Sequence, residues 1–377
     1  MSVEGIGLAL SGGGFRAGLF HLGALWRLNE LGWLQRIDDI TSVSGGSITS
    51  AHLGLQWSKL HFDSQGVATN FQQVVVTPLR EFYSHTIDTT TILTGMLNPF
   101  ISAGEKLDHA YAKRLFGKAT LQNLPDPEPG VPRFTFYATN LQTGASVRMS
   151  RAYLGDYRIG RIEQPTIRLS SVVAASSAFP PFYCPFEIEV DPEAWKKWDE
   201  GGDFFKPLAN QKKLYLGDGG IYDNMGMERL WNRRQTILIS DAGAPMKVFE
   251  REGEVAENYA GTMSRVLDIM TEQTRALRKR MFVSALKSNE KQGTYWGIAT
   301  RIADYALTEN HHAPPLLSDN AKTARLAQVR TRLDEFKPEE QEDLINWGYA
   351  LTDAAMRRYV IAPVVPAGSL PCPNHLV

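Results

Sequence analysis

The chain has 377 residues, of which 43% are apolar and 21% are charged, a composition typical of globular proteins with room for one large domain plus an extension, or for two domains. Its 40 Lys and Arg residues are balanced by 41 Asp and Glu residues, so it has no basic excess that would attract nucleic acid. The two cysteines, Cys184 and Cys372, are too few for a disulfide framework or a thiolate metal site.

The first predicted element is a buried strand at residues 6–10, joined by a glycine turn to a helix. The strand is a short apolar run, and the helix is indicated by leucines at positions 19, 22, 25 and 28. Between them stand Gly12, Gly13 and Gly14. Bare turn amides and a helix N-terminus then point at one spot, which favours negative charge.

The same pattern returns around Ser44. Residues 40–43 are predicted as a strand, Ser44-Gly45-Gly46 as a tight turn, and residues 47–57 as a helix. A serine on such a sharp strand-to-helix turn exposes its hydroxyl among small neighbours, which is the setting of a nucleophile.

Two later stretches resemble insertions, at about residues 58–130 and 187–213. The first mixes short apolar islands with polar sequence, and both a lid and a surface of packing helices are left open. The second combines Trp195, Trp198 and Phe204 with charges of both signs. For this one we favour a loop folded on its own aromatics over docking at a lipid interface.

The remaining core elements follow in order. Residues 133–139 and 145–149 are predicted as a hairpin, residues 166–175 as a helix, and residues 214–216 as a strand that delivers Asp218. Residues 236–240 are a further strand, and beyond residue 245 only helices are predicted. An apolar stripe at residues 263–281 is expected to pack on the core rather than to lie on anionic lipid.

Four of these blocks, in this order, resemble motifs of the patatin-like phospholipase family in its bacterial form. They are the turn from Gly12 to Arg16, the Ser44 elbow, the segment Ala175–Phe182, and Asp218-Gly219-Gly220. The sequence departs from the family motifs where Ser42 replaces the first glycine of the elbow and Ala17 replaces the last glycine of the turn. Both substitutes are small, so we expect both turns to survive.

The resemblance implies a three-layer α/β/α fold with a mainly parallel central sheet at residues 1–245, followed by a helical C-terminal extension at residues 246–377. It also implies a Ser-Asp dyad without histidine, with Ser44 as the nucleophile and Asp218 as the base. The implied oxyanion hole is made of the amides of Gly12, Gly13, Gly14 and Gly45, and the supporting residues are Arg16, Gly46, Gly219 and Gly220. We expect Arg16 to brace the turn or nearby carbonyls, and leave open a contact with a phosphate.

The implied activity is that of a lipid acyl hydrolase of the phospholipase A, lysophospholipase or esterase type. Its substrate would be a phospholipid or another lipid ester, with no metal or organic cofactor, and an activating partner or an oligomer is also implied. The few cysteines and an N-terminus without a signal-peptide core indicate a cytoplasmic location. Since no apolar run reaches the ~20 residues of a membrane span, any contact with a membrane is expected to be peripheral.

Other assignments stay open at this stage. A thioesterase, transacylase or peptidase could use the same dyad, and a non-catalytic lipid- or partner-binding module could keep the fold, although the intact dyad argues against that module. His21 and His52 lie along helices away from the turns, so a Ser-His-Asp triad is disfavoured. Nucleotide binding is disfavoured because Ala17 breaks the Gly-x-Gly-x-x-Gly spacing and no Gly-Lys-Ser/Thr follows.

Overall fold

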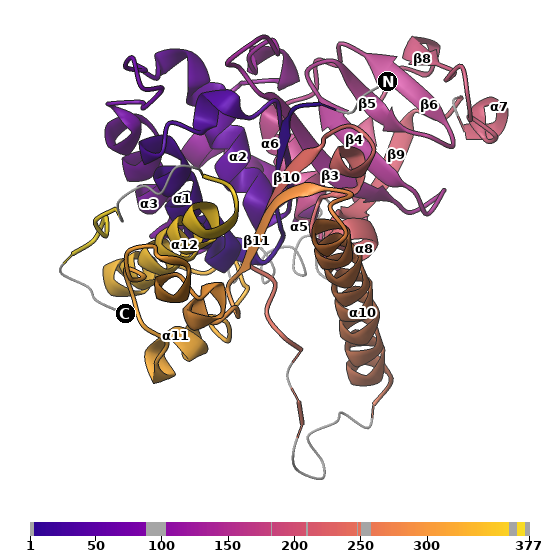
Figure 1. The fold of residues 1–377 in the computed structure, drawn as a ribbon. Coiled ribbons are helices and arrows are strands. Elements are labelled where there is room, and N and C mark those ends of the chain that lie inside the picture. Colours follow the sequence, from indigo (N-terminus) through magenta and orange to yellow (C-terminus); the bar gives the residue numbers. More distant parts are fainter. Residues whose placement is uncertain are drawn as a thin grey trace.

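A central mixed β-sheet flanked by helices forms the body of the protein (Figure 1). The computed structural model describes residues 4–87, 103–181, 183–208, 210–246, 248–249, 258–361 and 368–373. Residues 88–102 of the first insertion, and Phe182 of the Ala175–Phe182 segment, lie outside the described residues.

Five parallel strands form the half of the sheet that carries both glycine turns. In spatial order they are β11 (Gln292–Gly297), β10 (Thr236–Asp241), β1 (Ile6–Leu10), β2 (Asp39–Val43) and β3 (Arg133–Asn140). Beyond β3 the strands pair antiparallel, in the order β4 (Ser146–Ser150), β5 (Tyr153–Asp156), β6 (Gly160–Glu163) and β8 (Trp195–Lys196). The predicted hairpin is β3–β4, and the sheet as a whole is mixed.

Strand β9 (Lys213–Asp218) reaches the centre of the sheet from the opposite direction. It pairs antiparallel with β3 and with β7 (Phe186–Glu189). Along β3, the pairing with β2 ends at Tyr137, which lies opposite Val43. The pairing with β9 starts at the next residue, Ala138, which lies opposite Asp218. Because β4 occupies the other edge of β3 at these positions, β2 and β9 share one edge and meet end to end, which brings Asp218 level with Ser44.

Alternate residues of the central strands face two separate cores, as a sheet between two helical layers requires. Leu8 and Leu238 belong to the large core, which also contains α1 (Gly14–Glu30), α2 (Gly45–Gln56) and α12 (Pro338–Tyr359). Ala9 and Ile237 belong to a smaller core with Phe282 of α10 (Tyr259–Lys287). The predicted three-layer α/β/α fold is therefore confirmed.

The shorter helical elements connect these layers. They are η1 (Leu34–Arg36), η2 (Trp57–Lys59), η3 (Gln72–Val76), α3 (Thr77–Tyr83), α5 (Ala103–Tyr111), η4 (Ala112–Phe116), η5 (Leu121–Asn123), α6 (Leu169–Ser176), η6 (Pro192–Ala194), α7 (Phe205–Leu208), α8 (Gly220–Asp223), α9 (Glu228–Trp231), η7 (Ile302–Tyr305), η8 (Thr308–Asn310) and α11 (Ala321–Leu326). The helix predicted at residues 166–175 corresponds to α6.

The described parts of the two insertions pack onto the body. In the first, α3 and α5 bury Leu79, Tyr83 and Leu107 in the large core. In the second, Trp195 is buried and Trp198 Nε1 donates a hydrogen bond to the carbonyl oxygen of Asp156, at 2.7 Å. The second insertion thus folds against the antiparallel half of the sheet, where Trp198 packs on Tyr153 of β5, rather than on its own aromatics as the favoured interpretation expected.

The region beyond residue 245 is largely helical, but the expectation of helices alone is wrong at β11. The six residues of β11 form a strand because they pair in parallel with β10, which lies far away in the sequence. The expectation that the apolar stripe of α10 packs on the core is also wrong for most of its length, since Met263, Met270 and Leu277 are exposed. Among the described helices, none is both long and apolar enough to span a bilayer.

Helix α12 packs closely along α1 and makes the C-terminal region part of the main core (Figure 1). Arg27 of α1 lies 2.7 Å from the buried Asp353 carboxylate of α12, which also pairs with Arg357 at 2.7 Å. A Cβ atom on Gly348 would lie 2.0 Å from the carbonyl oxygen of Phe20. The proposed division of the chain at residue 245 stays a prediction.

We expect Gly348→Val to destabilise the protein, because the added side chain would push α12 away from α1. Overpacking of this kind typically costs ~1–3 kcal/mol of unfolding free energy. The measurement is thermal or denaturant unfolding, with Glu339→Val as the matched control at an exposed position of the same helix. Equal stability of the two variants would contradict the close packing of α1 and α12.

Candidate active site

Ser44 occupies a strained position between β2 and α2. Its backbone has φ 50° and ψ −120°, in a region that residues other than glycine rarely adopt and that costs roughly 1–3 kcal/mol. A Cβ on Gly45 would lie 1.9 Å from the Gly14 carbonyl oxygen, and one on Gly46 would lie 2.6 Å from that of Leu10. Both glycines are needed because the two turns touch.

Buried serines from β2, α2 and α6 form a hydrogen-bonded cluster around the turn at Ser44. The amide of Ser44 donates to Ser176 Oγ at 3.0 Å, and Ser176 Oγ lies 2.8 Å from Ser47 Oγ. Ser42 accepts hydrogen bonds from the hydroxyls of Ser47 and Ser50, at 3.2 and 2.6 Å. The serine that replaces the expected glycine at position 42 is thus a partner in the cluster, and the elbow survives as predicted.

The Asp218 carboxylate is buried, and it lines the same cavity as Ser44. The amide of Gly220 donates to Asp218 Oδ1 at 2.6 Å. Burial raises the pKa of Asp218 to about 7, against the opposing effects of the Gly220 and Ser44 hydrogen bonds. Thr139 Oγ1 fixes the Asp218 carbonyl at 2.8 Å, so both backbone and side chain are held in place.

The glycine turn offers free amides beside Ser44. Among the hydrogen bonds of the described residues, none has the amide of Gly13, Gly14 or Gly45 as its donor. The expectation for Gly12 needs correction, because its amide donates to the carbonyl oxygen of Asn224 at 3.1 Å. The donors available to an oxyanion are therefore fewer than the sequence indicated.

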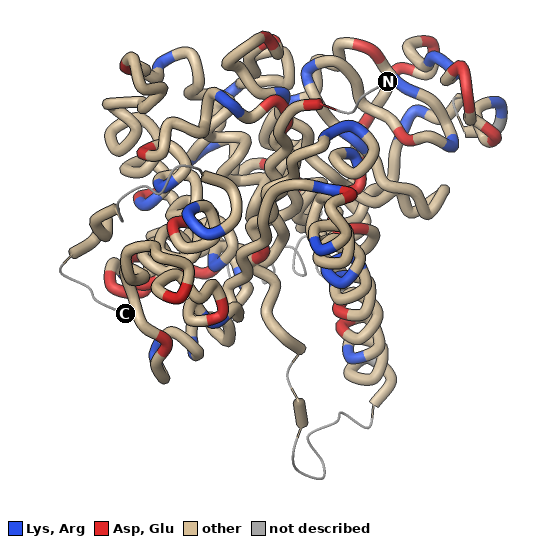
Figure 2. Tube along the Cα trace, in the orientation of Figure 1, with Lys and Arg blue, Asp and Glu red and all other residues tan. Residues whose placement is uncertain are grey.

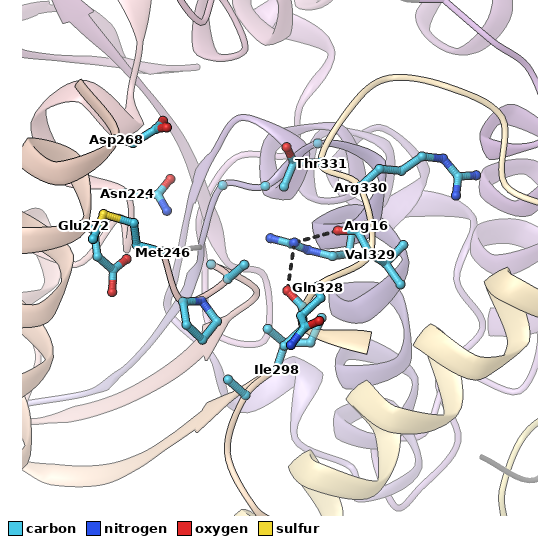
Figure 3. A pocket seen from close by; sticks show the side chains of 18 of the residues that line it. Arg16, Asn224, Met246, Asp268, Glu272, Ile298, Gln328, Val329, Arg330 and Thr331 are labelled. Atoms are coloured by element: carbon cyan, nitrogen blue, oxygen red, sulfur yellow. Dashed lines mark hydrogen bonds between the residues drawn. The ribbon is translucent and has the colours of Figure 1, made fainter. Parts of the chain in front are cut away.

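Arg16 braces carbonyls around the turn, as expected. Its buried guanidinium donates to the carbonyl oxygens of Ala242 at 2.7 Å, Val329 at 2.8 Å and Ala327 at 3.2 Å. Figure 3 shows Arg16 pointing toward the segment that carries Val329. The side chain is only 2% exposed, and both of its Nη atoms donate to these carbonyls, whereas Nε has no hydrogen-bond partner among the described residues.

The two histidines near the glycine turns serve packing. His21 is buried, with Nδ1 2.8 Å from Ser240 Oγ and Nε2 2.9 Å from the Ser11 carbonyl oxygen. Burial lowers the pKa of His21 to about 4. His52 Nε2 lies 3.2 Å from the carbonyl oxygen of Val74. Among the described residues, no hydrogen bond joins either ring to Ser44, which agrees with the disfavoured triad.

A cavity of about 2050 Å³ opens beside Ser44 and Asp218. One wall is formed by α10, through Asp268 and Glu272, and the opposite wall by residues 298–334 (Figure 3). Asn224 also lines it, although the sequence indicated only a turn role for that residue. In the described part of the chain, no group of three or more His, Cys, Asp or Glu residues could hold a metal ion.

A family model described as patatin-like phospholipase matches residues 8–231, more than half of the chain. The chain belongs to the patatin-like phospholipase family. The match includes the glycine turn, the Ser44 elbow and Asp218. In this patatin-like phospholipase, however, α10 and residues 298–334 lie beyond the matched part, and they supply both walls of the cavity.

Solved structures with a similar fold include human GIVD cytosolic phospholipase A2, which is 13% identical, with a TM-score of 0.50 over 93% of this chain and 61% of that one. The same human enzyme in complex with methyl gamma-linolenyl fluorophosphonate is 15% identical, with a TM-score of 0.51 over 93% and 58% of the two chains. This patatin-like phospholipase spans about three-fifths of the human enzyme's length. At these identities the likeness concerns the fold alone. No curated protein matches the chain significantly in sequence.

We expect Ser176→Ala to lower the free energy of unfolding by ~1–3 kcal/mol, because the buried amide of Ser44 would lose its acceptor. Ser170→Ala is the matched control, since Ser170 is buried in the same helix and its hydroxyl has no hydrogen-bond partner. Chemical denaturation of the two variants measures the difference. An equal effect of both substitutions would show that the serine cluster does not support the elbow.

Proposed function

We propose that this chain is a lipid acyl hydrolase that cleaves fatty-acyl esters of phospholipids or other lipids through Ser44 and Asp218. The observation that carries the proposal is that β2 and β9 meet on one edge of β3, which brings Ser44 and the buried Asp218 carboxylate into one cavity. The family match supports the class of reaction, and the cavity is larger than the ~300–1,000 Å³ of ordinary ligand pockets, which suits a long acyl chain.

In the proposed first step, Asp218 accepts the proton of Ser44 while the Ser44 oxygen attacks the ester carbonyl carbon. The carbonyl oxygen becomes negative and is stabilised by the free amides of Gly13, Gly14 and Gly45. The carbon–oxygen bond to the alcohol then breaks. The departing alcohol takes the proton from Asp218, and the acyl group stays on Ser44.

In the second step, water attacks the acyl-enzyme with Asp218 as the base. The fatty acid leaves and Ser44 regains its proton. A carboxylate at its ordinary pKa of ~3.9 is a weak base, and the raised pKa of Asp218 brings it close to the working pH that favours proton transfer. These groups supply both steps, so the proposal invokes no metal or organic cofactor.

The proposal also covers the setting of the reaction. A phospholipid substrate lies in a membrane, so we include peripheral contact between this protein and a membrane surface. A cytoplasmic location and an activating partner or oligomer remain part of the proposal, on the sequence arguments given above.

We expect Ser44→Ala and Asp218→Asn each to lower kcat/KM for ester hydrolysis by at least about a thousand-fold, the scale seen when a nucleophile or its base is removed. The assay is fatty-acid release from a phospholipid and from a soluble short-chain ester. Ser170→Ala and His52→Gln are the controls and keep their activity. Undiminished hydrolysis by Ser44→Ala would rule out the proposed nucleophile.

The same assay separates the alternative activities. A thioester with the same acyl chain tests thioesterase activity, and an added lysophospholipid acceptor tests acyl transfer. We expect the oxyester to be hydrolysed to free fatty acid, so a strong preference for the thioester or for the acceptor would replace the hydrolase assignment.

The pH dependence follows from the buried carboxylate. Since the pKa of Asp218 is about 7, we expect kcat/KM for a soluble ester to rise with pH, with its midpoint near that value. The folded pKa also lies above the ordinary ~3.9, so ionisation of Asp218 costs folding free energy as the pH rises between the two values. Asp218→Asn should therefore gain stability relative to the parent over that range. A rate that is flat from about pH 5 to about pH 9 would contradict a buried carboxylate base.

A further inference from the structure

The face of the sheet that carries the smaller core changes character beyond β2. On β3, Phe134 and Phe136 point into the large core. Because side chains alternate along a strand, Arg133, Thr135 and Tyr137 lie on the opposite face. Among the described residues, the smaller core includes none from β3, β4, β5 or β6. This part of the second face is therefore polar, and core packing does not account for its residues.

Arginines gather on this polar face. Arg148 of β4 lies opposite Tyr137 in the strand pairing, so the two side chains share one face. Further arginines come from α9 and from the turn that follows it. Together they are Arg133, Arg148, Arg229, Arg233 and Arg234, and we call them the arginine cluster. Figure 2 shows blue gathered at the turn after α9, beside the place where Figure 1 labels β4.

One buried carboxylate is shared by three members of the cluster. Asp39 of β2 is fully buried and lies 2.5 Å from Arg234. The same carboxylate lies 3.6 Å from Arg229 and 3.8 Å from Arg133. A single negative charge therefore faces three guanidinium groups, and it can neutralise only one of them.

The two other carboxylates at the cluster do not restore the balance. Glu228 lies 3.7 Å from Arg148, but it also lies 3.5 Å from Arg278 of α10. Asp38 lies 3.7 Å from Arg234. The five arginines of the cluster therefore face three carboxylates, which leaves an excess of two positive charges.

Arg233 is the member without a carboxylate. It is exposed, and within the described part of the chain its side chain makes no ion pair. The pKa of Arg233 is lowered, first by the charge of Arg229, then by partial burial, and further by Arg148 and Arg133. The arginines therefore repel one another, and a negative ligand among them would relieve this repulsion.

The cluster also holds hydrogen-bond donors that have no acceptor. The Nε atoms of Arg133, Arg148 and Arg229 are buried, and among the described residues they have no hydrogen-bond partner. Arg229 is only 3% exposed, and its Nη1 donates to the hydroxyl of Tyr153 at 3.2 Å. Buried donors without acceptors destabilise a protein, so an anion with several free lone pairs would satisfy groups that the fold leaves unpaired.

A cavity of about 890 Å³ reaches the cluster at Arg133 and Tyr153. This volume lies within the ~300–1,000 Å³ of ordinary ligand pockets. The other cations of the cavity wall already have carboxylate partners, which are Asp126 for Arg151 and Glu163 for both Arg161 and Lys196. The cavity has no lining residue in common with the cavity at Ser44. A small ligand could thus reach the cluster without entering the proposed catalytic site.

The arrangement of the cluster favours a phosphate group over a carboxylate. A carboxylate pairs with one planar guanidinium as a fork, whereas a tetrahedral phosphate accepts from several arginines that approach from different directions. These arginines come from β3, from β4 and from the α9 region. A phosphate group carries about 1.5–2 negative charges at neutral pH, which matches the excess of two. Nucleic acid is disfavoured, because Asp126 and Glu163 line the same cavity and would repel a strand.

We propose that the arginine cluster binds the phosphate group of a small soluble ligand, which enters through the cavity at Arg133 and Tyr153. This site goes beyond the proposed function, since it takes no part in the chemistry at Ser44. The attraction is electrostatic, so binding should weaken as the salt concentration rises.

The test is isothermal titration calorimetry of the full chain with pyrophosphate, in a buffer without phosphate or sulfate. We expect saturable binding at one site per chain. Arg233→Gln should raise Kd by about ten-fold or more, because a charge-assisted contact is lost, and Arg148→Gln should act in the same direction. Arg114→Gln is the matched control and should bind like the parent. Arg114 is exposed on η4, an element that packs into the large core through Phe116.

The absence of saturable binding would overturn the proposal. An equal rise in Kd for Arg233→Gln and Arg114→Gln would also overturn it, because the attraction would then be diffuse. Arg332 lines the cavity at Ser44, so a loss of binding in Arg332→Gln alone would place the anion there instead. Unfolding temperatures establish that each variant folds, and Arg148→Gln carries the test if Arg233→Gln does not fold.

Two further probes identify the source of the phosphate group. Inorganic phosphate represents a free ion, and glycerol 3-phosphate represents a lipid head group without its acyl chains. We expect pyrophosphate or phosphate to bind at least as tightly as glycerol 3-phosphate, and binding of glycerol 3-phosphate alone would contradict a soluble ligand. If the parent protein cleaves no ester, the proposed function fails, and the titration still decides whether the arginine cluster binds phosphate.

Discussion

The site depends on one edge of β3 being shared by two strands that run in opposite directions. Strand β2 leaves that edge at Val43, and β9 arrives there with Asp218. A hydroxyl on a strand-to-helix turn and a carboxylate on a strand end are thereby brought together, although they lie far apart in sequence. The register of these strands, rather than any local motif, sets their contact.

Holding the two groups together has a cost in stability. Ser44 has a strained backbone, and the Asp218 carboxylate is removed from water, and each effect opposes folding. The serine cluster and the Gly220 amide offset part of this cost by satisfying the polar groups around the contact. Burial of apolar side chains in the large core, which includes residues of α12, offsets the remaining cost in stability.

The sequence was enough to predict the glycine turn and the elbow, because each has a local signature of glycines between apolar runs. The three-layer fold and the role of Asp218 came instead from the resemblance of four motifs to the family. It was not enough for the contacts made between distant segments. Ser176 lies under Ser44 only after folding, and the Gly12 amide is taken by a carbonyl from another loop. The apolar stripe at residues 263–281 of α10 was expected to face the core but is mostly exposed, since periodicity shows that a helix has an apolar side but not what that side contacts.

The most direct measurement is covalent labelling with a fluorophosphonate ester, followed by mass spectrometry of the digested protein. Such a reagent phosphonylates a serine only where the hydroxyl is activated. The account expects a single adduct on the peptide that contains Ser44, and none in Asp218→Asn. An adduct on a different serine, or equal labelling of Ser44 without the Asp218 carboxylate, would contradict the central claim that this pair is the reactive site.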